Sequence, residues 1–267
     1  MVRTPEGGNL TRLEGIAGAL SGAYSSKQPV RPPIETDPSL TIDDAYAIQL
    51  LQVDAWLAGG AVVKGYKVGL TSKAMQNQLG VDQPDFGHLT AAMFHLDHTP
   101  IDTAQFLQPK VEPEIAFVLG RELAGPGVNV AEAIRAVDFV LPSLELIDSR
   151  VADWKIGIVD TISDNASSGG VILGSKPTRL ADVDLTKVGC NLVIDSQIVA
   201  TGAGSAVLGS PLNALVWLAN TLGARGISFK PGDVILPGSV TAAQVVRAGS
   251  VAQASFANLG SVTAVFA

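Results

Sequence analysis

Residues 111–115, Val111-Glu112-Pro113-Glu114-Ile115, form an apolar segment that carries two carboxylates at alternate positions. In an extended chain, side chains at positions i and i+2 point to the same face, and Pro113 biases Glu112 toward the extended region. A third acid, Glu145, lies in a second apolar stretch, residues 141–147. The pattern therefore predicts two strands that bring three carboxylates into apolar surroundings.

A buried carboxylate is costly unless it is protonated, ion-paired or bound to a metal, and no Lys or Arg follows Glu114 until Arg121. A divalent cation is the simplest partner. Three carboxylates overcompensate a dication by one negative charge, so such a site favours Mg²⁺ or Mn²⁺ and needs a nearby cation before it accepts an anionic ligand. One oxygen from each acid leaves about half of an octahedron open, which is typical of a catalytic metal.

The same residues also allow an interpretation without a metal. The glutamates could face solvent on an edge strand, where proline is tolerated, and Glu145 could be unrelated to them.

Composition limits the class of protein. The chain has 267 residues, of which 47% are hydrophobic and 16% charged, and no apolar run is long enough for a membrane span. The apolar excess favours buried subunit contacts and hence a homo-oligomer. A net charge of −7 argues against nucleic acid as the main partner, and the polar start, without a secretory pattern, favours the cytoplasm.

The cysteine and histidine residues offer little for a metal site. Cys190 is the single cysteine of the sequence, which excludes an intrachain disulfide and a multi-cysteine zinc site, and its apolar neighbours suit a buried strand. His95 and His98 are interpreted as part of a loop before a proline, so they are weak candidates for metal ligands.

The first 60 residues are predicted to be helical. Apolar residues recur at helical spacing in residues 10–24, and three prolines then end the helix. Thr41 and Asp44 are typical of a capping box, and the helix that they begin is expected to end at Gly59-Gly60. We therefore expect a helical lobe over 1–60 and a catalytic domain over 61–267.

Ala61 to Leu70 is predicted to be a strand that contains two lysines. Lys64 and Lys67 are three residues apart, so they point to opposite faces of a strand. If Lys64 points to water, Lys67 points inward and requires negative charge nearby. A lysine that snorkels at the strand end is the alternative.

Asp85 lies in the turn-rich stretch Val81 to Gly87. It could act as an acid or base there, but an Asx-turn is the default interpretation.

Further along the chain, strands are predicted with two helices among them, Val130 to Val137 and Pro211 to Leu222. The predicted strands, including a hairpin through Asp195-Ser196, are Phe139 to Ile147, Gly170 to Leu173, Asn191 to Ile194, Gln197 to Thr201, Asp233 to Leu236, Ala252 to Phe256 and Ser261 to Phe266.

Several motifs in order along the chain resemble those of the 2-keto-4-pentenoate (2-hydroxypenta-2,4-dienoate) hydratases of aromatic meta-cleavage pathways, in the fumarylacetoacetate hydrolase superfamily. The motifs are Lys67 to Thr71 (KVGLT), Gly80 to Gly87 (GVDQPDFG), Gln108 to Ala116 (QPKVEPEIA), Pro142 to Arg150 (PSLELIDSR), Asp164 to Ser167 (DNAS) and Leu208 to Asn220 (LGSPLNALVWLAN). The resemblance extends from about Leu40 to the C-terminus.

The resemblance implies an α+β fold, with a helical N-terminal lobe followed by a mixed-β roll of the fumarylacetoacetase C-terminal type. It implies Mg²⁺ or Mn²⁺ held by Glu112, Glu114 and Glu145, and Lys67 and Asp85 in the active site. It also implies that the hydroxyl of Ser167 lies near a small 2-keto acid substrate, and that the protein forms a homo-oligomer associated with neighbouring pathway enzymes.

The expected reaction is hydration of the dienoate to a 4-hydroxy-2-oxo acid, with Lys67 and Asp85 as proton carriers. The main rival is the sister 2-oxo-3-hexenedioate (4-oxalocrotonate) decarboxylase, in which the loop equivalent to the one with Asp85 tends to lack this acid. Gly238 to Ala243 (GSVTAA) departs from the hydratase pattern and favours the decarboxylase. A scaffold subunit with a structural metal is the hypothesis from a different class.

Overall fold

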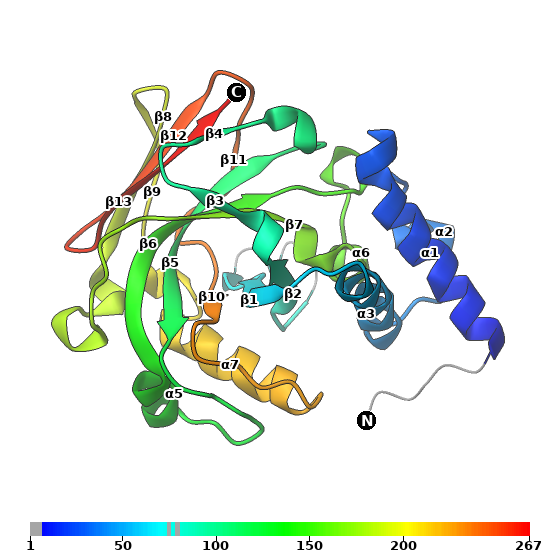
Figure 1. Cartoon of the computed structure of the whole chain (residues 1–267), viewed down its shortest axis with the longest axis horizontal. Coiled ribbons are helices and arrows are strands. Elements are labelled where there is room, and N and C mark those ends of the chain that lie inside the picture. The colour runs from blue at the N-terminus through cyan, green and yellow to red at the C-terminus, as the bar shows by residue number, and fades with distance from the viewer. Residues whose placement is uncertain (1–6, 74–75, 78–80) are drawn as a thin grey trace.

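The computed structural model describes residues 7–73, 76–77 and 81–267. Helices α1 (Gly7–Ser26), α2 (Pro33–Thr36) and α3 (Ile42–Ala58) precede the first strand and lie together on one side of the molecule (Figure 1). The predicted capping box at the start of α3 is confirmed, because Asp44 N donates to Thr41 Oγ1 at 3.1 Å and Thr41 N donates to Asp44 Oδ2 at 3.0 Å. Leu13 and Leu20 of α1 pack with Ile48 of α3 in a small hydrophobic core.

The described remainder of the chain forms two mixed sheets accompanied by helices, so the predicted α+β class is correct (Figure 1). The larger sheet has the order β2 (Asp85–Thr90), β1 (Val63–Gly69), β10 (Val234–Leu236), β5 (Lys110–Leu119), β6 (Val137–Ile147), β7 (Ser168–Leu173) and β3 (Phe94–Leu96), with β11 (Gln244–Val245) beside β5. The second sheet has the order β4 (Pro100–Ile101), β13 (Gly260–Phe266), β12 (Val251–Phe256), β8 (Gly189–Ile194) and β9 (Gln197–Ala203). The described α-helices that lie between the later strands are α5 (Val130–Ala136), α6 (Ile158–Ser163) and α7 (Pro211–Gly223).

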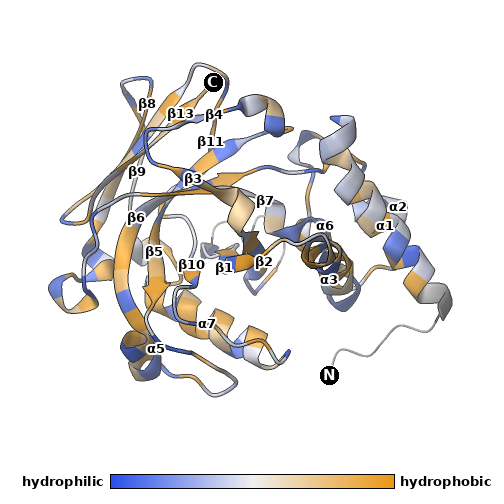
Figure 2. Ribbon diagram, viewed as in Figure 1, coloured by the Kyte–Doolittle hydropathy of each residue, from blue (hydrophilic) through white to orange (hydrophobic). Residues whose placement is uncertain are grey.

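Burial of apolar side chains holds these layers together. Hydrophobic residues predominate along β5, β6 and α7 (Figure 2). Leu215, Leu218 and Leu222 of α7 are fully buried in the main core, at the i, i+3 and i+7 spacing of one helical face. Phe117 of β5 is buried in the same core. Truncating any of these leucines to alanine would cost about 2–5 kcal/mol.

The central position of β5 excludes the edge-strand alternative for the glutamates. Strand β6 pairs along the whole length of β5, whereas β10 and β11 pair on the other side only at residues 117–118 and 110–111. Pro113, which has no N–H, therefore lies where no strand pairs on that side. The segment after β10 covers this gap, and Val240 N donates to Pro113 O at 3.1 Å.

Two of the local interpretations were wrong. Asp85 does not belong to a turn but begins β2, where it pairs with Gly69 of β1. His95 lies in β3 instead of a loop, paired in parallel with Ile172 of β7. Both strands are short and depend on pairing with a distant partner, which overrides the local turn signals.

Candidate active site

The register between β5 and β6 brings the three predicted acids together. Glu112 lies directly opposite Glu145, and Glu114 points to the same face of β5. Carboxylate oxygens of the three residues lie within 4.8 Å of one another. Glu114 and Glu145 are completely buried, whereas Glu112 is partly exposed. This is the arrangement that the spacing of the sequence predicted.

The carboxylates have few partners in the part of the chain that the structure describes. Gly238 N donates to Glu114 Oε2 at 2.7 Å, and Lys67 Nζ forms an ion pair with Glu145 Oε1 at 3.2 Å, whereas Glu114 Oε1 and Glu145 Oε2 have no hydrogen bond there. Burial and mutual repulsion raise the pKa of Glu114 well above its usual value and that of Glu112 to about 7. Three clustered carboxylates with so few donors offer the hard oxygen ligands that a divalent cation prefers, so these residues fit Mg²⁺ or Mn²⁺.

Lys67 supplies the cation of the site. It is buried in β1, with Nζ 3.2 Å from Glu145 Oε1 and donating to Ala166 O at 3.0 Å. Burial alone lowers the pKa of Lys67, but Glu145 and the other nearby carboxylates raise it above its usual value. The surrounding carboxylates therefore favour the charged form of Lys67 and supply the negative charge that an inward-facing lysine requires.

Asp85 lies beside Lys67 in the same wall. Neither of its carboxylate oxygens makes a hydrogen bond of good geometry within the described residues, and the side chain is 1% exposed. Burial raises the pKa of Asp85, although the ammonium of Lys67 opposes this effect. A Cβ at Gly69 would lie 2.2 Å from Asp85 Oδ1, so any larger residue at this position would displace the carboxylate.

These groups line a cavity of about 440 Å³. Lys67, Asp85, Glu112 and Ser167 contribute to its polar wall. The larger apolar side chains around it are Val68, Leu70, Ile147, Trp154, Ile156 and Val240. The arrangement combines a cation site, a buried ammonium and a buried acid in a pocket large enough for a small organic acid.

The segment after β10 closes another side of the cavity. Ser239 to Ala243 line it, and Gly238 has a φ of 120°. A Cβ on Gly238 would lie 2.1 Å from Thr71 Oγ1, so glycine meets both the backbone and the steric requirement here. The segment Gly238 to Ala243 is the one whose sequence departs from the hydratase pattern.

Ser167 belongs to an unusual turn. Asn165, Ala166 and Ser167 have φ values of 51°, 50° and 51°, so three successive residues that are not glycine adopt the left-handed region. Ser167 Oγ donates to Asp164 Oδ2 at 3.0 Å, so its proton is used within the protein although the side chain lines the cavity. Ala166 directs its carbonyl to Lys67.

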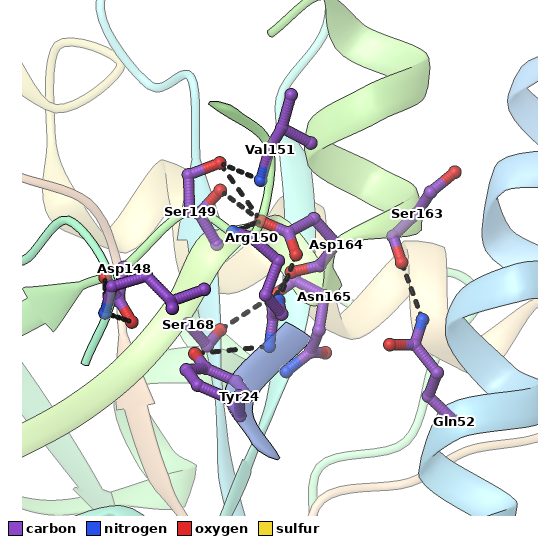
Figure 3. Close-up of polar contacts among 12 residues, drawn as sticks. Tyr24, Gln52, Asp148, Ser149, Arg150, Val151, Ser163, Asp164, Asn165 and Ser168 are labelled. Atoms are coloured by element: carbon purple, nitrogen blue, oxygen red, sulfur yellow. Dashed lines mark hydrogen bonds and ion pairs between the residues drawn. The ribbon is translucent and has the colours of Figure 1, made fainter. Parts of the chain in front are cut away.

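A buried polar network behind the cavity holds this turn (Figure 3). Arg150 Nε and Nη2 donate to the carboxylate and the carbonyl of Asp164, and Arg150 N donates to Asp164 Oδ2 at 3.1 Å. The ring of Tyr24, on α1, lies 5.1 Å from the Arg150 guanidinium carbon. The network therefore connects the N-terminal helices to the backbone that positions Lys67.

Sequence reasoning did not assign roles to Arg150 and Asp164. Arg150 ends one of the motifs that resemble the hydratase family, and Asp164 begins another. In the structure the two residues form a buried ion pair beside the three left-handed residues. His95 and His98 lie outside the cavity lining, and among the described residues the three glutamates are the one cluster suited to a metal.

Comparison with known proteins agrees with these observations. Residues 64–267 match the family model of the fumarylacetoacetate (FAA) hydrolase C-terminal domain. Over 97% of its length the chain is 42% identical to 2-keto-4-pentenoate hydratase 2 of Dechloromonas aromatica, covering 99% of that protein. The chain belongs to the 2-keto-4-pentenoate hydratase family of the fumarylacetoacetate hydrolase superfamily.

Other members of the superfamily are similar over nearly the full chain. A 2-hydroxyhexa-2,4-dienoate hydratase of Comamonas testosteroni is 42% identical over 89% of this chain and 90% of its own. The structure of 4-oxalocrotonate decarboxylase from Pseudomonas putida G7, complexed with magnesium and adipate, has a TM-score of 0.94 and 34% identity over 99% of this chain and 100% of that one. In the described part of this hydratase-family chain, no helix has the length and apolar character needed to cross a bilayer.

Proposed function

We propose that this chain is a metal-dependent hydratase that adds water to 2-hydroxypenta-2,4-dienoate, or to a longer-chain homologue, in aromatic meta-cleavage catabolism. The product is a 4-hydroxy-2-oxo acid. The observation that carries the proposal is the buried carboxylate of Asp85 beside Lys67, in one cavity with Glu112, which belongs to the three-glutamate cluster. Relatives named as hydratases, at 42% identity, support it.

Glu112, Glu114 and Glu145 would hold Mg²⁺ or Mn²⁺. When bound, the metal supplies a Lewis acid for the 2-oxygen and carboxylate of the substrate. The solved decarboxylase with magnesium and adipate supports a cation and a carboxylate ligand in this fold.

The proton transfers belong to the residues of the chain. Ketonisation removes a proton from the 2-hydroxyl group and adds one at C5, which gives a 3-enoate with a 2-keto group. Addition of water then forms the C4–O bond and places a proton at C3. Lys67 and Asp85 carry these protons, because both lie in the cavity wall, where burial raises the pKa of Asp85.

Decarboxylation of 2-oxo-3-hexenedioate is the second candidate. Ser239 to Ala243 line the cavity and depart from the hydratase pattern, and the decarboxylase structure is similar along the whole chain. Water addition needs a proton acceptor, whereas loss of CO₂ does not. The buried acid Asp85 therefore favours hydration.

A structural metal in a scaffold subunit fits less well. Such a site would be closed by protein ligands, whereas Glu112 borders an open cavity next to Lys67.

The test is a paired assay of the Mg²⁺-loaded protein on 2-hydroxypenta-2,4-dienoate and on 2-oxo-3-hexenedioate, with products followed by NMR and CO₂ measured separately. Hydration of the first without CO₂ from the second is expected. The Asp85→Asn variant should lose hydration by roughly 10²–10⁴-fold. Asp82→Asn, at an exposed position three residues away, is the control. Release of CO₂ without hydration would assign the decarboxylase activity instead.

We also propose a helical lobe over 1–60, of which residues 1–6 lie outside the described part, a catalytic domain over 61–267, and a homo-oligomer in the cytoplasm. Ile198 and Leu96 are 64% and 76% exposed and suit a subunit contact. Light scattering coupled to size exclusion tests the oligomer, and a monomeric mass would contradict it.

A further inference from the structure

Lys110 extends the row of charged side chains on β5. It lies two residues before Glu112, so it points to the same face of the strand, with about 6.6 Å between the Cα atoms. Its side chain is partly exposed and lines the cavity that contains Lys67 and Asp85. The row therefore runs from the completely buried Glu114 through Glu112 to a cation at its more exposed end.

An aromatic ring fixes the position of this cation. The ammonium of Lys110 lies 4.0 Å from the centroid of the Trp154 ring. Trp154 is itself held, because its Nε1 donates to Gln108 O at 3.1 Å. A cation–π contact of this kind stabilises an ammonium group while leaving its N–H donors available.

The two lysines of the cavity differ in their partners. Lys67 is already paired with Glu145 at 3.2 Å and donates to Ala166 O at 3.0 Å. Within the described residues, Lys110 Nζ has no ion pair and no hydrogen bond. Lys110 is thus the cavity cation that retains free donors, and the indole beside it limits the water that would screen an added anion.

We infer that Lys110, held against Trp154, binds a carboxylate group of the substrate. The inference rests on the proposed function for the class of substrate, a 2-keto acid. The carboxylate is either C1, next to the keto group, or a second carboxylate at the end of a longer tail. Both are the same ligand chemistry, and two probes separate them.

The experiment measures binding and not turnover. Isothermal titration of the Mg²⁺-loaded protein uses two saturated acids that cannot be hydrated: 2-oxopentanoate, with one carboxylate, and 2-oxohexanedioate, with two. Lys110→Met should weaken binding of at least one of them on the order of 10-fold or more, and Lys110→Arg should restore most of it. Lys64→Met, at an exposed position of β1, should leave both affinities unchanged.

Each outcome has a distinct meaning. Weaker binding of both acids assigns Lys110 to the C1 carboxylate, and weaker binding of 2-oxohexanedioate alone assigns it to a tail carboxylate. Unchanged affinities for both, or a wild-type protein that binds neither acid, would overturn the inference. Mg²⁺ titration without acid is a further readout, because a lysine that only offsets the charge of Glu112 would change metal affinity and leave acid affinity unaltered. Binding of both acids without hydration of any dienoate would refute the proposed function alone.

Discussion

Lys67 Nζ lies 3.2 Å from Glu145 Oε1, and both side chains are buried. The pair gives the glutamate cluster one positive charge against three negative charges when all are ionised. A dication would bring the sum to zero, so the cluster and the lysine together are matched to a divalent metal.

Mg²⁺ or Mn²⁺ should stabilise the protein through this cluster. At a metal concentration of about 100 times the Kd, the gain is about 2.7 kcal/mol, or roughly 5–10 °C in Tm for a chain of this size. Thermal unfolding in EDTA and in Mg²⁺ measures the gain. Glu145→Gln should abolish it and Glu122→Gln, at an exposed position, should not. An equal Tm shift in Glu145→Gln would place the metal elsewhere.

Removal of the Lys67 charge should lower kcat strongly while the protein remains folded. Lys67→Met keeps most of the side-chain volume, so we expect kcat to fall by roughly 10²–10⁴-fold while Mg²⁺ still binds. Steady-state kinetics with the dienoate substrate, together with metal titration, provide the measurement. Lys64→Met on the same strand serves as the control. Near wild-type kcat in Lys67→Met would remove the lysine from the proton path.

Loss of one partner of the buried Arg150–Asp164 pair should destabilise the fold more than replacement of both partners by apolar residues. Arg150→Met leaves Asp164 buried and unpaired, which costs about 3–5 kcal/mol, whereas Arg150→Met with Asp164→Leu should recover much of this loss. Urea unfolding measures both. The double variant should still lose activity, since Asp164 also binds Ser167 Oγ in the left-handed turn. Full activity in a stable double variant would separate the network from the site.

Local rules account for the parts of the site that the sequence predicted. Strand geometry alone places Glu112 and Glu114 on one face of their strand and Lys64 and Lys67 on opposite faces of theirs. The capping box of α3 is likewise read from four consecutive residues. In each case the chemistry is determined by near neighbours in the chain.

Long-range pairing accounts for what the sequence did not predict. Asp85 looks like a turn residue, but its strand forms only against β1, where Gly69 leaves room for the carboxylate. Ala166 adopts the left-handed conformation next to the ion pair between Arg150 and Asp164, which lie 14 residues apart in the sequence. No local pattern encodes a backbone conformation that distant side chains maintain.

His88 should make stability depend on pH. The side chain is 3% exposed, and burial lowers its pKa to about 4 from an ordinary value near 6.5. Between these values the unfolded chain binds a proton that the folded protein does not, so the free energy of unfolding falls as pH falls. From about pH 7 to about pH 5 the loss is about 2 kcal/mol. Urea unfolding of wild type and His88→Phe in EDTA should show a shallower dependence in the variant, whereas His98→Phe, at an exposed position, should match wild type. Equal slopes in all three proteins would mean that His88 binds a proton as readily in the folded protein as in the unfolded chain.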